Sequence, residues 1–207
     1  MLRRLERPAP PASDDLDLLA QTLGGWVEGR GSLLVVADLT TALDVVGSRL
    51  PPMLLGDLLT LSRTPVARAA LISWQGVGAL RRLMPFTDVI CVGRDGREVE
   101  GGGLARGVHE TPGAGWGRGT VVRWMRDQLA HAMTSPVKVL YLGASPADEM
   151  AFAELAGKAA TVHVGPPPPR GSRATFRLAD AAAARGLLTA LARAAAADPA
   201  TRDAAAS

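Results

Sequence analysis

The sequence is poor in cysteine, lysine and aromatic residues. Its 207 residues include one cysteine, Cys91, and aromatic residues make up 4% of the chain. A lone cysteine excludes an internal disulfide, and its apolar neighbours predict a buried structural thiol. Because 47% of the residues are hydrophobic but few are aromatic, we expect one domain whose core consists of leucine, valine and alanine.

Long apolar runs and strong net charge are absent as well. No run reaches the roughly 18 residues of a membrane helix, and the N-terminus lacks the hydrophobic region of a signal peptide. The formal net charge is +3, with arginines and acids interspersed, so the basic patch and aromatic platforms of a nucleic-acid-binding surface are missing. We therefore expect a cytoplasmic protein with neither a nucleic acid nor a membrane as its partner.

What the sequence does contain is an alternation of predicted strands and helices. Short apolar runs without polar alternation are typical of strands buried on both faces, as in parallel sheets; they lie at 33–37, 66–72, 89–92, 137–142, 161–164 and 174–178. Amphipathic helices are expected at 13–23, 51–62, 76–84, 120–133, 147–155 and 181–196. Repeated β-α-β units predict an α/β fold, a three-layer sandwich with a mostly parallel, Rossmann-like sheet.

The domain organisation is simple. Residues 1–12 are charged and then rich in proline and alanine, and residues 197–207 are mostly small, compositions that predict a disordered lead and a disordered tail. Residues 13–196 form the single predicted domain. Within it, the glycine-rich interval 97–117 predicts a loop or a small hairpin.

Polar residues follow several of the predicted strands. Asp38 and Thr40 follow the first, Ser73 follows the second, Arg118 precedes a helix, and 143–149 follow a later strand. Because ligands of open α/β sheets bind at the carboxyl ends of the strands, we expect these residues around one site. For Asp38 a second interpretation stays open, since an aspartate in this position also forms turns or caps helices.

The order and spacing of these segments resemble the haloacid-dehalogenase (HAD) superfamily, and more narrowly its trehalose-6-phosphate phosphatase family. That family carries D-x-D-G-T-L, S-G-R, V-G-N-H-G-x-E, K-G-x-A-L and G-D-D-x-T-D-E in this order. The present chain has DLTTAL at 38–43, SWQ at 73–75, VGRDGRE at 92–98, RGTVV at 118–122 and GASPADE at 143–149. The resemblance runs from about residue 30 to 195 and implies a HAD-like fold.

The resemblance implies phosphoryl transfer to a carboxylate. It makes Asp38 the nucleophile and Ser73 the hydroxyl that holds the phosphate. Thr40 stands where the family has a second aspartate, which acts as general acid and base and is worth on the order of 10² to 10⁴ in rate. Arg118 stands where the family has a phosphate-binding lysine, and its planar fork is not equivalent to an ammonium group. The candidate catalytic residues are thus Asp38 and Thr40, and the candidate substrate-binding residues are Ser73 and Arg118.

The sequence also has few side chains that could bind magnesium at this site. Ala144 and Ser145 stand in place of an acidic pair, which leaves Asp38 and Asp148 as candidate metal ligands and predicts weak Mg²⁺ binding if the protein is active. Asp148 can equally be an acid in the first turn of a helix. The substrate-recognising cap of the family would lie between residues 96 and 118, an interval so short that the cap is essentially absent.

Three functional hypotheses follow. The first is a trehalose-6-phosphate phosphatase-like phosphomonoester hydrolase scaffold with a degenerate site, whose turnover is impaired or lost. The second is a non-catalytic phosphosugar-binding or regulatory module that acts through a protein partner. The third is a true phosphatase that acts on a small or macromolecular substrate and uses Asp148 or Asp95 in an unusual metal site. In each, the expected small ligand is a phosphorylated molecule such as a sugar phosphate. The three histidines match no metal motif, and His131 and His163 are expected to be solvent-facing or hydrogen-bonded structural residues.

Overall fold

The structure is a computed structural model that describes residues 19, 23, 31–47, 49–110, 115–133, 135–168 and 170–198. The predicted lead, 1–12, lies outside these residues, as does the predicted tail from 199 onward. Of the first predicted helix, 13–23, only Leu19 and Leu23 are described, and both are helical and buried in the core.

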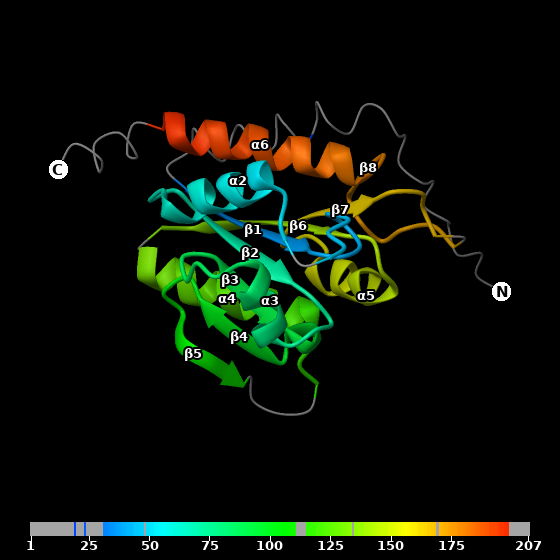
Figure 1. The fold of residues 1–207 in the computed structure, drawn as a ribbon. Helices are drawn as coiled ribbons and strands as arrows, with labels where there is room; N and C mark the ends of the chain where they lie inside the picture. Colours follow the sequence, from blue (N-terminus) through cyan, green and yellow to red (C-terminus); the bar gives the residue numbers. More distant parts are fainter. Residues whose placement is uncertain are drawn as a thin grey trace.

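The centre of the fold is an eight-stranded sheet in the order β5-β4-β3-β2-β1-β6-β7-β8. In Figure 1 its strands extend from β5 at the lower left to β8 at the upper right. Six of its strands are mutually parallel, and β4 and β5 form an antiparallel hairpin at one edge. Each apolar run that was predicted to be a strand is one. The strands are β1 Ser32–Asp38, β2 Ala67–Ile72, β3 Ile90–Gly93, β4 Glu98–Gly101, β5 Ala105–Glu110, β6 Val137–Gly143, β7 Ala160–Val164 and β8 Phe176–Leu178.

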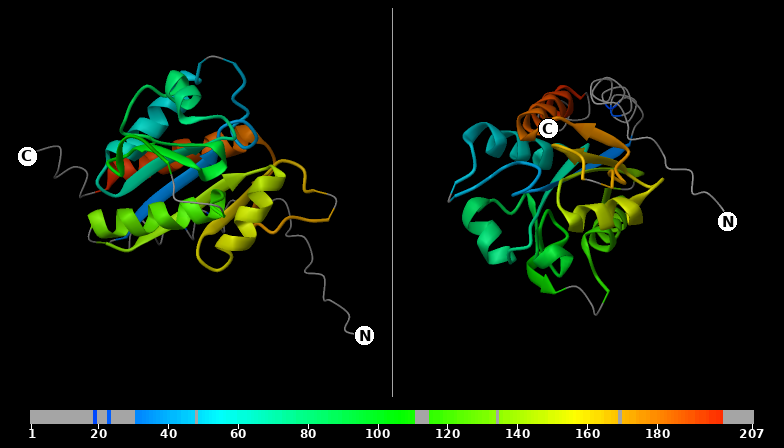
Figure 2. Two further views of the ribbon diagram at one scale, coloured as in Figure 1. Left: turned by 90° about the horizontal axis from the view of Figure 1, so that it is seen from below. Right: turned by 90° about the vertical axis from the view of Figure 1, so that its right-hand side faces the viewer.

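Helices cover both faces of the sheet, which confirms the three-layer sandwich (Figures 1 and 2). One face packs against α2 (Pro52–Arg63), α3 (Val77–Leu83) and α6 (Ala181–Ala197). The other packs against α4 (Arg118–Met133) and α5 (Pro146–Leu155). A single turn of 3-10 helix, η1 (Arg94–Gly96), joins β3 to β4.

The side-chain alternation along β1 decides where its last residue points. Val35 and Ala37 belong to the core on the α2 and α6 side, whereas Leu34 and Val36 belong to the core on the α4 and α5 side. Successive side chains of a strand point to opposite faces. Asp38 therefore shares the face of Val36, and its carboxylate lies toward the first turns of α4 and α5.

The interior matches the composition. It is built mainly from leucine, valine and alanine, and Cys91 in β3 is fully buried. Burial raises the pKa of its thiol to about 11, so the thiolate that would react is scarce at neutral pH. This confirms the structural interpretation of Cys91. Among the described residues, no helix has both the length and the apolar character needed to cross a membrane.

The interval in which a cap would be inserted is short. Between residues 96 and 118 the described part of the chain forms the β4–β5 hairpin and its connections, as predicted for 97–117. Residues 111–114 are not described. Within the residues that the structure describes, loops and the starts of α4 and α5 cover the carboxyl ends of β1, β2 and β6.

Candidate functional site

An arginine lies between two aspartates at the carboxyl end of β1. Nη1 of Arg118, in the first turn of α4, donates to Oδ2 of Asp38 and to Oδ1 of Asp148, the latter at 2.5 Å. The side chains of Arg118, Asp38 and Asp148 are 4%, 2% and 0% exposed. These residues form a buried network of charges and are not the open floor of a cleft.

Both carboxylate oxygens of Asp38 have donors. Oδ1 accepts the backbone N–H groups of Thr40 and Thr41, at 2.9 and 2.6 Å, while Oδ2 accepts from Arg118. The bonds to Oδ1 form an aspartate turn, so the turn-forming interpretation of Asp38 is present in the structure. Its role as a nucleophile stays a prediction.

Asp148 is both an acid in the first turn of a helix and a member of the network. Its Oδ2 accepts the backbone N–H groups of Ala144 and Ser145, at 2.9 and 2.8 Å, and the hydroxyl of Ser145 at 2.7 Å. Ser145 caps α5, and Asp148 completes a capping box with it. A Cβ atom on Gly143 would lie 2.3 Å from Cγ of Asp148, so only glycine at the end of β6 leaves room for this carboxylate.

Tyr141 is a site residue that the motifs did not indicate. Its hydroxyl donates to Oδ1 of Asp148 at 2.6 Å, and its side chain is fully buried. It is the only tyrosine of the chain and lies in strand β6 among buried apolar residues. Because a buried phenol normally requires a hydrogen-bond partner, a lone tyrosine in a core strand was a signal that could have found it.

The charges of the network hold one another in the ionised state. Burial opposes the charged form of Arg118, yet the Asp148 and Asp38 carboxylates beside it raise its pKa above the usual value. Burial alone would raise the pKa of Asp148, but Arg118 and the hydrogen bond from Tyr141 outweigh it and the pKa is lowered. The pKa of Tyr141 is raised well above its usual value by burial and by the charge of Asp148, so its hydroxyl keeps the proton that it donates.

The remaining candidate residues lie near this network. Ser73, at the end of the neighbouring strand β2, is buried, and its hydroxyl accepts the backbone N–H of Gln75 at 3.1 Å. Thr40 contributes its backbone N–H to Asp38. The structure thus brings Asp38, Arg118 and Asp148 into direct contact and places Thr40 and Ser73 beside them in turns.

The outer edge of Arg118 is held by Asp95 in η1. Nε and Nη2 of the guanidinium lie 2.9 and 2.8 Å from Oδ1 of Asp95, whose side chain is half exposed. Arg94 and Asp95 have φ angles of 50° and 56°, in the left-handed region that side chains with a Cβ atom rarely adopt. Two consecutive strained residues therefore position the carboxylate that meets Arg118.

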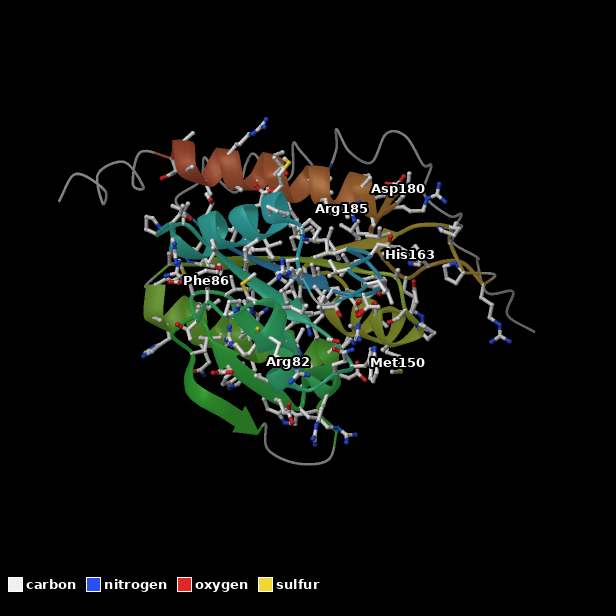
Figure 3. All side chains as sticks on the ribbon, viewed as in Figure 1. Arg82, Phe86, Met150, His163, Asp180 and Arg185 are labelled. Atoms are coloured by element: carbon white, nitrogen blue, oxygen red, sulfur yellow. The ribbon has the colours of Figure 1, made fainter. Side chains whose placement is uncertain are left out.

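A cavity of about 550 Å³ opens beside this outer edge. Its walls include two tryptophans and two arginines besides Arg118, namely Trp74, Trp116, Arg94 and Arg97. Met150, which Figure 3 labels on α5, lines it as well, and Trp74 and Met150 are 63% and 69% exposed. Large exposed apolar side chains next to cations are typical of a binding surface.

Glu149 has a structural role. Its carboxylate accepts from the hydroxyl of Ser172 at 2.6 Å and from the backbone N–H of Arg173 at 2.7 Å, and it lies 3.0 Å from Nδ1 of His163. His163, labelled in Figure 3, is also 3.0 Å from the carbonyl oxygen of Pro166. This confirms His163 as a hydrogen-bonded structural residue.

The residues at the predicted metal site do not fit a divalent cation. Oδ2 of Asp38 and Oδ1 of Asp148 converge on one point, and Nη1 of Arg118 occupies it. Mg²⁺ requires near-octahedral oxygen ligation, and no group of three or more His, Cys, Asp or Glu side chains suited to a metal ion occurs in the described part of the chain. The two predicted ligands are brought together, but with a guanidinium between them.

No family model and no curated protein matches the sequence, but solved structures match the fold. The C-terminal domain of trehalose-6-phosphate phosphatase from C. albicans superposes with a TM-score of 0.68 at 15% identity, over 90% of this chain and 99% of that chain. The Aspergillus fumigatus trehalose-6-phosphate phosphatase gives 0.63 at 17% identity, over 88% and 99%. The C-terminal domain of the Candida albicans trehalose synthase regulatory protein gives 0.55 at 12% identity, over 83% and 97%. The predicted HAD-like α/β fold is confirmed.

Proposed function

We propose that this chain is a trehalose-6-phosphate phosphatase-like HAD scaffold that has lost turnover of phosphate esters. The observation that carries the proposal is the engagement of Asp38 by Arg118. An attack on phosphorus requires a carboxylate oxygen that the substrate can reach, and Asp38 is 2% exposed with donors on both oxygens. The ester could reach this group only if the buried network opened.

The charge around Asp38 also opposes the reaction. Asp38, Asp95 and Asp148 surround one guanidinium, so the carboxylates outnumber the cation by two. A phosphate ester would add further negative charge to this end of the sheet. Phosphoryl transfer depends on positive groups that stabilise the transferred phosphoryl group, and the one cation of the network is already committed to carboxylates.

Proton transfer lacks a suitable group as well. The hydroxyl of Thr40 does not act as a general acid or base near neutral pH, which removes a contribution on the order of 10² to 10⁴ in rate. Asp95 is a half-exposed carboxylate beside the network, but it is ion-paired with Arg118. Both the nucleophile and its proton-transfer partner are therefore impaired, by burial in one case and by substitution in the other.

The test is phosphate release from trehalose-6-phosphate and a panel of phosphate monoesters, with Mg²⁺ or EDTA. We expect wild-type protein to release no more phosphate than the folded Asp38→Asn variant. Metal-dependent release that Asp38→Asn abolishes would instead identify an active phosphatase with a rebuilt site. As a positive control, the combination of Thr40→Asp, Ala144→Asp and Arg118→Lys returns the missing acid, the missing ligand and the lysine.

The second candidate function is a non-catalytic binding module, which the cavity beside Arg118 favours. Exposed Trp74 offers an apolar face to a sugar ring, and Arg94 and Arg97 offer donors to a phosphate group. The ligand proposed is a phosphorylated small molecule such as a sugar phosphate. The alternative ligand is a protein, in line with the regulatory protein among the structural neighbours. Either version suits the expected cytoplasmic location.

Titration calorimetry with trehalose-6-phosphate, glucose-6-phosphate and inorganic phosphate distinguishes these versions. Saturable binding that Arg97→Ala weakens at least about tenfold, the loss of one charge-assisted contact, supports the small-molecule version. Absence of binding to all three, combined with co-elution of the chain with a purified trehalose synthase, supports the regulatory version. Arg193→Ala on α6, outside the lining of the cavity, is the matched control.

A further inference from the structure

We infer that Arg118 is a built-in cation that takes the place of a divalent metal ion between Asp38 and Asp148, so that the site is complete without metal. This inference goes beyond the proposed function because it concerns what holds the buried carboxylates together, whether or not the protein turns over a substrate. It starts from the disagreement between the metal expected at these positions and the residues present.

Nη1 of Arg118 lies at the point where the two carboxylates meet. One nitrogen atom bonds to one oxygen of each aspartate, so the two carboxylates, which are 110 residues apart in the sequence, converge on a single point. A bridging cation would need this same point. Since Nη1 carries part of a positive charge, it excludes a metal ion both sterically and electrostatically.

The other oxygens of the two carboxylates already accept hydrogen bonds. Oδ1 of Asp38 accepts two backbone N–H groups, and Oδ2 of Asp148 accepts donors from Ala144 and Ser145. Oδ1 of Asp148 also accepts the hydroxyl of Tyr141. A metal ion could recruit these oxygens only by displacing hydrogen bonds that hold the turns after β1 and β6.

The guanidinium of Arg118 has hydrogen-bond partners along both of its edges. Nη1 faces inward to the two buried aspartates, while Nε and Nη2 face outward to Asp95. A planar fork with donors on two edges suits this arrangement, whereas an ammonium is a compact point charge. Arg118 is therefore positioned as a permanent part of the site, unlike a metal ion that exchanges with solution.

Removal of the guanidinium should uncover a latent cation site. In an Arg118→Ala variant, Asp38 and Asp148 remain as two buried carboxylates without a counter-ion, and repulsion between them destabilises the folded state. A divalent cation that binds between them would relieve this repulsion. Because a ligand that binds only the folded state stabilises it, the variant should acquire a metal-dependent melting temperature that the wild type lacks.

The test compares melting temperatures in EDTA and in about 10 mM Mg²⁺, Mn²⁺ or Ca²⁺ at matched ionic strength, a concentration range suited to weak oxygen-ligand sites. The wild type should shift by less than about 1 °C. Arg118→Ala should melt lower in EDTA and gain about 4 °C or more with a divalent ion. Arg123→Ala, a matched change on the same helix whose partner is the half-exposed Glu154, should show no metal response.

Two further variants make the result unambiguous. Adding Asp148→Asn to Arg118→Ala removes one of the two converging carboxylates and should abolish the metal response. Arg118→Gln removes the charged guanidinium but keeps more of the side chain than Ala does, and it is the variant to be measured if Arg118→Ala does not fold. The inference is overturned if metal stabilises the wild type, or if a folded variant without the guanidinium shows no metal response. Phosphate release plays no part in this readout, so it is independent of the proposed loss of turnover.

Discussion

Two of the three arginines of helix α4, Arg118 and Arg123, pair with acids in opposite environments. Arg118 is 4% exposed and lies between buried aspartates, whereas Arg123 is 36% exposed and pairs with Glu154, which is 32% exposed. Water screens the second pair and can replace either partner, so its net contribution is small. In the first, neither charge can return to water without opening the fold. The same chemistry on one helix is thus structural in one place and nearly neutral in the other.

A similar contrast separates the buried interior of the site from its rim, by which we mean the residues that line the neighbouring cavity. The network of Asp38, Arg118 and Asp148 is satisfied within the protein, whereas Trp74 and Arg97 line the cavity next to it. The interior groups hold the carboxyl ends of β1 and β6 together. The rim is the part that a ligand can reach. Any binding function is therefore expected to depend on the rim and stability on the interior.

The largest effect is expected for Arg118→Met. Removing the cation leaves two buried carboxylates unpaired, which we expect to lower the free energy of unfolding by about 3–5 kcal/mol. Arg123→Met should change it by no more than about 1 kcal/mol. Urea unfolding of both variants at neutral pH measures the difference. Equal losses would contradict the distinction between the two arginines.

The next effect concerns the loss of stability at acidic pH. Because the pKa of Asp148 is lowered in the folded state, its contribution is complete above its unfolded pKa of about 3.9 and is lost as the pH falls through its lower, folded value. Asp148→Asn should lower the free energy of unfolding at pH 7 by about 1.5–3 kcal/mol, the worth of a hydrogen bond to a charged group.

The same variant should also lose less stability than the wild type on acidification below about pH 4. Urea unfolding at a series of pH values tests both parts of this prediction. If the free energies of unfolding of the two proteins change with pH in parallel, Asp148 has no role in the loss of stability at acidic pH.

A smaller effect of opposite sign is expected at η1. Arg94→Gly relieves the left-handed backbone at φ 50°, a strain of about 1–2 kcal/mol, but gives the unfolded chain more freedom, worth about 0.5–1 kcal/mol. The exposed ion pair of Arg94 with Glu98 contributes little. We expect a gain of up to about 1 kcal/mol.

Arg97, three residues later, provides the matched comparison. Its φ is −88°, so Arg97→Gly relieves no strain and should destabilise the protein by about 0.5–1 kcal/mol. Thermal unfolding of both variants shows whether their changes in stability have opposite signs. A loss at Arg94 as large as that at Arg97 would mean that the left-handed turn is not strained.

The smallest effect on stability is expected for Trp74→Ala. Because this side chain is mostly exposed, its removal should change the free energy of unfolding by no more than about 0.5 kcal/mol. The same variant should weaken binding of a sugar phosphate if the rim is the binding surface. A large loss of stability in urea unfolding would instead show that Trp74 contributes to stability as the buried residues of the network do.

The sequence by itself determined the order of strands and helices. Apolar runs such as 33–37 and 137–142 are local signals, and the strands found there, β1 and β6, lie within a residue of those bounds. It also determined that Asp38 ends β1, because an aspartate after a buried run marks the strand end. The sequence also placed Asp148 at the start of a helix, where it forms a capping box with Ser145, only three residues away.

Only the tertiary structure decided how the charges pair. The bonds of Arg118 to Asp38 and Asp148 span 80 and 30 residues, and no local pattern states which strand ends meet. A resemblance placed Arg118 at a phosphate, but the fold aims its guanidinium at carboxylates and adds Tyr141 behind them. Burial is the reason: a charge without water must find its counter-charge within the protein, and that partner is known only once the chain is folded.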